Sequence, residues 1–146
     1  MSGPALRQVT SHRAIHENAW HEVQEALKMA EALLFRDDRE RFAEVAEVFL
    51  EVAEARVLVH AHEEETGLYL EWIEVNPDIH PRIKTLKHEH RALRRFATDL
   101  EEAMVNGRHQ AALDSMREFA ATLKSHSAHE EGILTEVVDA KGRVSL

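Results

Sequence analysis

The 146-residue chain contains no cysteine, which excludes disulfide frameworks, thiolate zinc sites, iron–sulfur clusters and cysteine nucleophiles. It also has only 5 glycines and 3 prolines, so few positions interrupt a helix. This composition excludes an all-β fold, collagen and long disorder. Because cysteine is absent, any chemistry in a site of this protein must use nitrogen and oxygen donors.

Positive charge is also in short supply, since 18 Lys and Arg against 27 Asp and Glu give a net charge of −9. Such a charge repels the phosphate backbone of nucleic acids and anionic membrane surfaces. The chain has no run of eighteen apolar residues, and residues 1–10 lack the apolar core of a secretory signal. We therefore expect a cytoplasmic protein that binds neither nucleic acid nor membranes.

Helical periodicity runs through four long segments that are separated by short breaks. Because helices with short connections favour antiparallel neighbours, the pattern predicts an all-α protein, an up-down-up-down four-helix bundle. Its length suits one domain, residues 1–146. The expected helices cover approximately residues 9–35, 39–75, 82–105 and 109–139, with a frayed tail over residues 141–146.

Histidine is the residue type in excess, with 11 in the chain. Each predicted helix has one buried stripe that is apolar except for histidine and glutamate. Burying these groups without partners costs several kcal/mol apiece, and a bound metal is the obvious partner. The polar residues of the stripes are His12, His16, His60, Glu64, His90, His126 and Glu130.

These residues are expected to lie at one level of the bundle. In two antiparallel helices joined by a short loop, residues at the same level have numbers whose mean is the loop midpoint. This midpoint falls in a predicted connection for His16 with His60, Glu64 with His90, and His90 with His126. For His12 with His60 the midpoint lies two residues away from that position, or about 3 Å at the helical rise. A site for two ions about 3.5–4 Å apart can still use such a residue.

Two His-x-x-x-Glu motifs, His60 with Glu64 and His126 with Glu130, each point one imidazole and one carboxylate from the same helix face. A carboxylate in such a position can bridge two ions. Together with His90 and the first-helix histidines, the set contains too many donors for one tetrahedral zinc ion. It suits two six-coordinate ions with one position left open for a small molecule.

The order His, His-x-x-x-Glu, His, His-x-x-x-Glu, one element per helix, resembles the hemerythrin and HHE cation-binding family. The resemblance extends from about His12 to Leu134 and includes the doubled acids Glu64-Glu65 and Glu130-Glu131. It implies a four-helix bundle with a non-haem di-iron centre. By matching positions, it implies the following roles: His60, His90 and His126 as iron ligands, Glu64 and Glu130 as bridging carboxylates, and His16 or His12 as the ligand from the first helix.

One half of the pattern departs from the marine hemerythrins, which carry a second histidine four residues before the position of His90. This chain has Leu86 there. Either His12 and His16 together restore the count from the first helix, or the site has four histidines, as in several HHE proteins.

The resemblance implies two iron ions as cofactor and a small diatomic or peroxide ligand, so the expected function is binding or sensing of oxygen, nitric oxide or peroxide. An enzyme that consumes peroxide or nitric oxide is the alternative, and a metal-free helical interaction module is a third. No Glu-x-x-His motif of a ferritin-like centre occurs. His21, His80, His88 and His109 are expected outside the site. His62, His129, Glu65 and Glu131 flank it, either as hydrogen-bond partners of ligands or as exposed residues.

Overall fold

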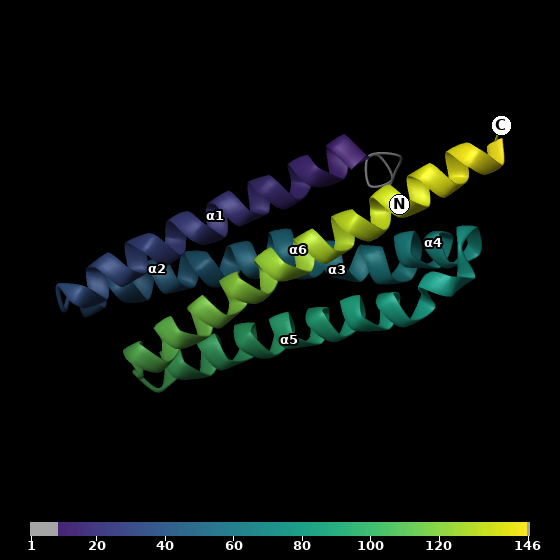
Figure 1. Cartoon of the computed structure of the whole chain (residues 1–146). Helices are drawn as coiled ribbons and strands as arrows, with labels where there is room; N and C mark the ends of the chain where they lie inside the picture. The colour runs from purple at the N-terminus through teal and green to yellow at the C-terminus, as the bar shows by residue number, and fades with distance from the viewer. Residues whose placement is uncertain (1–8, 146) are drawn as a thin grey trace.

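Four long helical rods make up the computed structural model, which describes residues 9–145, and the side chains of residues 11–140 (Figure 1). The first rod is α1 (Val9–Phe35), and the third and fourth are α5 (His80–Val105) and α6 (His109–Ser145). The second rod spans residues 39–75 and begins with α2 (Arg39–Val52). No strand occurs in residues 9–145, so the predicted all-α class with four packed helices is confirmed.

Local side-chain chemistry explains where the rods begin and end. The Asp38 side chain accepts a hydrogen bond from the Arg41 backbone N–H at 3.2 Å and caps α2. After the second rod, the Asn76 side chain accepts one from the backbone N–H of Asp78, also at 3.2 Å. Gly107 follows α5 with φ of 67°, in the left-handed region that ends helices at low cost. The breaks therefore lie where the sequence predicts them.

Two predicted boundaries were wrong. Helix α5 begins at His80, not Arg82, because Pro81 falls in the first turn, where its missing N–H has no helical partner to lose. Helix α6 continues to Ser145, so residues 141–145 are helical and not a frayed tail. A single glycine, Gly142, costs a helix only about 1 kcal/mol and does not end it. The last residue, Leu146, lies outside the described part.

The second rod is one continuous path, but it is not the single regular helix that the periodicity predicts. After α2 come a π-helical segment η2 (Ala53–Leu58), α3 (Val59–Glu63), a second π-helical segment η3 (Glu64–Leu68) and α4 (Tyr69–Val75). The Tyr69 backbone N–H donates to the Glu64 carbonyl five residues earlier. Each wider turn rotates the residues that follow it relative to a regular helix. A short 3-10 turn, η4 (Pro77–Ile79), leads into α5.

Contacts between neighbouring rods join the beginning of one helix to the later part of the other. Helix α1 packs against α2 and α6, and α5 packs along α6. Between α1 and α6, ion pairs join Arg13 to Glu131 and Glu31 to Arg117. These pairings are compatible with the antiparallel up-down-up-down order expected from the sequence.

The buried apolar side chains form two clusters. The larger contains residues from all four rods, among them Val57, Leu93 and Leu123. The smaller contains Leu68, Leu86 and the residues of α6 around Ile133. On the second rod, α5 and α6, one histidine lies in the sequence between the members of the two clusters. These histidines are His60, His90 and His126. No helix in residues 9–145 combines the length and apolarity needed to cross a membrane.

Candidate metal centre

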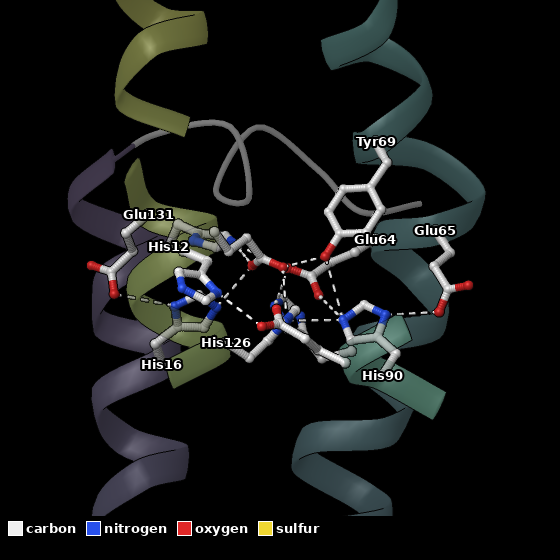
Figure 2. Close-up of polar contacts among 12 residues, drawn as sticks. His12, His16, Glu64, Glu65, Tyr69, His90, His126 and Glu131 are labelled. Carbon is white, nitrogen blue, oxygen red and sulfur yellow. Dashed lines mark hydrogen bonds and ion pairs between the residues drawn. The ribbon is translucent and has the colours of Figure 1, made fainter. Parts of the chain in front are cut away.

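A layer of polar side chains lies between the two apolar clusters (Figure 2). Among the side chains of residues 11–140, the buried polar or charged ones are His12, His16, Glu64, His90, His126 and Glu130. All of them belong to the set that the sequence predicts. The seventh predicted residue, His60, is partly buried, with 15% of its side chain exposed. The structure therefore brings the seven residues together from all four rods.

The first group of donors comes from α1 and the second rod, with one carboxylate from α6. It consists of His12, His16, His60, Glu64 and Glu130, whose ligand atoms all lie within 4.8 Å of one another. His12 Nε2 is 2.7 Å from Glu130 Oε1, and His16 Nε2 is 2.9 Å from the same oxygen. Both histidines of α1 thus face the site. This is the arrangement expected if His12 and His16 together restore the histidine count from the first helix.

The second group consists of Glu64, His90, His126 and Glu130, again with ligand atoms within 4.8 Å of one another. His126 Nε2 is 3.1 Å from Glu130 Oε2, and His90 Nε2 is 3.4 Å from Glu64 Oε1. Glu64 and Glu130 belong to both groups. Their two oxygens face different histidines, which is the arrangement that a bridging carboxylate needs.

Several buried polar atoms in this layer lack a hydrogen bond. Glu130 Oε1 has none, although two imidazole nitrogens lie within 2.9 Å of it. His60 Nε2 also has none, although it lies 3.2 Å from Glu64 Oε2. A buried polar atom without a partner is costly. At these two atoms, imidazole nitrogens and carboxylate oxygens lie close together without a hydrogen bond, which fits a cation between them, so the residues present can hold a metal ion.

Three of the histidines have a carboxylate behind them. The Nδ1 atoms of His90 and His126 lie 2.7 Å from Glu65 and 2.8 Å from Glu89. His16 Nδ1 lies 3.4 Å from Glu131 on the other side of the cluster (Figure 2). A carboxylate at Nδ1 holds the proton there and turns the Nε2 lone pair toward the centre. These partners therefore orient the histidines for metal binding.

The doubled acids explain how the chain supplies these partners. In each Glu-Glu pair the first acid points into the layer, and the second reaches a histidine on another rod. Glu65 follows Glu64 and contacts His90, while Glu131 follows Glu130 and contacts His16. Arg94 also donates to Glu65 at 3.1 Å, and Arg13 donates to Glu131 at 2.9 Å. Each orienting carboxylate is thus itself fixed.

The two buried carboxylates perturb each other's ionisation. Burial and the neighbouring charge of Glu130 raise the pKa of Glu64 well above its usual value. The pKa of Glu130 is lowered well below its usual value, because hydrogen bonds from its neighbours outweigh the effect of burial. Two carboxylates this close cannot both ionise at neutral pH without a compensating positive charge. A bound cation would supply that charge.

The two facing histidines also differ in ionisation. Burial and the charge of His126 lower the pKa of His90 to about 4. The pKa of His126 is raised to about 10, because bonds to Glu130 and Glu89 outweigh burial. Their Nε2 atoms lie 3.0 Å apart, so one proton lies between them in the metal-free layer. A metal ion would take the place of that proton.

Tyr69 also belongs to the layer, although sequence analysis assigned it no role there. Its hydroxyl donates a hydrogen bond to Glu130 Oε2 and lies 3.3 Å from His90 Nε2. The Tyr69 ring stacks on the His90 ring, with centroids 5.7 Å apart and an interplanar angle of 13°. Burial and the charge of Glu130 raise the pKa of Tyr69, so the phenol is neutral in the metal-free layer.

The other histidines lie outside the layer, as expected. His21, His62, His80 and His88 are exposed, and His109 packs against the Phe42 ring at 5.5 Å. His129 is exposed, but its Nδ1 lies 2.8 Å from Glu89, the carboxylate behind His126. Sequence analysis did not identify Glu89. It directly precedes His90 and reaches His126 on α6, while His90 faces the centre.

A small cavity of about 20 Å³ adjoins the ligand atoms on the side of the larger apolar cluster. A cavity of this size has room for about one water-sized molecule. Its polar side is formed by His16, His60, Glu64, His90 and His126, and its apolar side by residues that include Ala19, Val57, Leu93 and Leu123. The centre is therefore accessible to a very small ligand in apolar surroundings.

Comparisons with protein-family models, with curated proteins and with solved structures gave no match for this chain.

Proposed function

We propose that the chain is a hemerythrin-like protein: a single domain, residues 1–146, folded as an antiparallel up-down-up-down bundle around two iron ions that bind dioxygen or a related small oxidant. The observation that carries the proposal is the sharing of Glu64 and Glu130 between two histidine groups. Two carboxylates common to two donor sets suit a pair of ions better than one ion.

The donor set supports a metal with six nitrogen and oxygen ligands, and the resemblance of the motifs to the hemerythrin and HHE family selects iron. Donor chemistry alone does not, because zinc and copper bind such ligands at least as tightly. When bound here, iron ions would supply electrons to small oxidants such as dioxygen, nitric oxide and peroxide.

The chain's own residues support the binding of a small ligand. Glu64 and Glu130 would hold the two ions, since each belongs to both donor groups. Val57, Leu93 and Leu123 limit water around the cavity, and such apolar walls govern whether an oxidant is carried or consumed. The net charge of −9 fits a small-molecule partner better than nucleic acid.

The test is metal analysis of the purified protein, with optical spectra taken before and after exposure to air, nitric oxide and peroxide. We expect two iron ions per chain and an absorption band that appears with the gas and disappears when the gas is removed. Sustained consumption of peroxide or nitric oxide by the iron-loaded protein would instead identify the enzyme alternative. Substoichiometric metal after growth and reconstitution with iron would reject both.

A further inference from the structure

The two donor groups are unequal. The group on the α1 side has three histidines and two carboxylates, whereas the group with His90 and His126 has two histidines and the same two carboxylates. Two six-coordinate ions bound in these groups would differ by one protein ligand. The second group therefore lacks one donor relative to the first.

Tyr69 Oη occupies the side of the layer where that donor is missing. The oxygen donates to Glu130, which both groups share, and lies 3.3 Å from Nε2 of His90, which belongs to the second group alone. Figure 2 shows the Tyr69 hydroxyl pointing into the cluster of histidines and carboxylates. The Tyr69 side chain is completely buried, so solvent does not explain its orientation.

The chain holds this oxygen in place. The Tyr69 ring stacks on His90 and also contacts Trp72, whose ring is tilted by 37° with its centroid 5.4 Å away. The π-helical segment η3 turns Tyr69 inward, although a regular helix would place it about 140° from Glu64 around the axis. A phenol held this firmly among carboxylates and imidazoles is placed as a ligand would be.

We propose that Tyr69 is a metal ligand, and that its Oη is the fifth protein donor to the ion held by Glu64, His90, His126 and Glu130. The inference rests on the proposed function only in requiring a metal ion in that group, not on the ion being iron. It makes the two donor sets equal in number but different in kind.

Ligation of the phenol is a proton exchange without electron transfer. The Oη–H bond breaks, an Oη–metal bond forms, and the proton passes to solvent. A bound cation favours the deprotonated form of its ligands and so overcomes the burial that keeps the phenol neutral. The phenolate adds one negative charge at this ion and makes the two ions electrically different.

The experiment uses the fact that the chain contains a single tyrosine, so any phenolate absorption reports on Tyr69. Metal-free protein is titrated at neutral pH with zinc, which is redox-silent, and the ultraviolet difference spectrum is followed. We expect phenolate absorption that saturates at one phenolate per chain. Loading with ferric iron is expected to add a visible phenolate-to-iron charge-transfer band.

Variants separate ligation from other effects of the metal. Tyr69→Phe is expected to lose both spectral signals and to bind one of the ions about 10–100-fold more weakly, while it keeps the other. Trp72→Phe removes the neighbouring indole, which also absorbs in the ultraviolet, and is expected to retain the phenolate signal.

Stoichiometric zinc binding with an unchanged phenol spectrum would overturn the inference and leave the proposed function standing. Absence of metal uptake would overturn both. If Tyr69→Phe does not fold, the titration of the unmodified protein decides alone.

Discussion

His90 and His126 face each other through their Nε2 atoms, 3.0 Å apart, across the contact between α5 and α6. Both Nδ1 atoms are engaged by carboxylates on the outside, at 2.7 Å and 2.8 Å. The two inner lone pairs therefore need positive charge between them, either one proton or one metal ion. Glu130 Oε1, which also lacks a hydrogen bond, faces two further imidazole nitrogens in the same layer.

Removal of a central histidine is expected to cost metal and stability together, because metal binding at this layer contributes to folding. We expect His60→Ala and His126→Ala each to lose bound metal. At metal concentrations 100 times the dissociation constant, bound metal contributes about 2.7 kcal/mol, so Tm should fall by roughly 5–10 °C. Metal analysis and thermal unfolding measure the two effects.

His88→Ala is the matched control for these variants, since His88 is an exposed histidine of α5. Its metal content and Tm are expected to match those of the unmodified protein. Unchanged metal content in both His60→Ala and His126→Ala would remove these residues from the site.

The carboxylates behind the histidines are expected to tune metal affinity without binding metal. Glu65→Gln and Glu89→Gln keep the side-chain shape but remove the charge that holds the Nδ1 proton of His90 or His126. We expect metal affinity to fall about 10–100-fold in each. Glu118→Gln, at an exposed position of α6, serves as the control. Equal affinities in all three variants would contradict the orienting role.

The two histidines of α1 are expected to act on one ion only, because both lie in the first donor group. His12→Ala and His16→Ala should each weaken one metal ion and leave the other bound by His90 and His126. Titration with zinc and metal analysis after dialysis would show the loss of about one ion per chain. His21→Ala, an exposed position on the same helix, should retain both. Loss of both ions in each variant would show that the groups do not bind independently.

Metal binding is expected to release protons. The pKa of His126 is raised to about 10 in the metal-free layer, so at pH 7 this imidazole carries a proton that the ion must displace. Affinity for zinc should therefore increase as the pH rises from 7 toward 10. Calorimetry in two buffers with different ionisation enthalpies measures the number of protons released. Identical heats in both buffers would refute the expectation.

Filling the cavity is expected to separate ligand binding from metal binding. Val57→Phe adds a ring beside the small cavity without removing any donor atom. We expect metal content to be unchanged and the affinity of the iron-loaded protein for azide, a small anionic probe, to fall about tenfold, since overpacking costs about 1–3 kcal/mol. Val48→Phe, on the exposed face of the same rod, is the control. Unchanged azide affinity in Val57→Phe would place the ligand elsewhere.

Much of this site could be predicted because two regular quantities determine it. Helical periodicity identifies His16, His90 and Glu130 as members of buried stripes, and short connections fix their relative heights. The free-energy cost of burying these polar groups without partners then indicates a cation. The midpoint of His12 and His60 lies two residues from the one that His16 gives, yet His12 Nε2 lies 2.7 Å from Glu130. The reach of the side chains absorbs that offset.

Other residues were missed because the second rod departs from regular helical geometry. A straight helix through residues 39–75 turns Tyr69 away from Glu64, whereas segment η3 turns both inward. Residue spacing alone does not reveal a π-helical turn, because its cause is the packing around it. Glu89 was missed because a charged residue beside a predicted ligand has the same pattern as an ordinary exposed one.

The polar layer divides the interior into a large and a small apolar half, and the two halves need not open together. The small half, around Leu68 and Ile133, lies across the layer from the larger half around Phe49 and Phe119. If a metal ion links the four rods at the layer, its removal is expected to let the small half exchange amide hydrogens faster than the larger one. The rate at which an ion enters or leaves would then be set by local opening of the smaller half and not by unfolding of the whole chain.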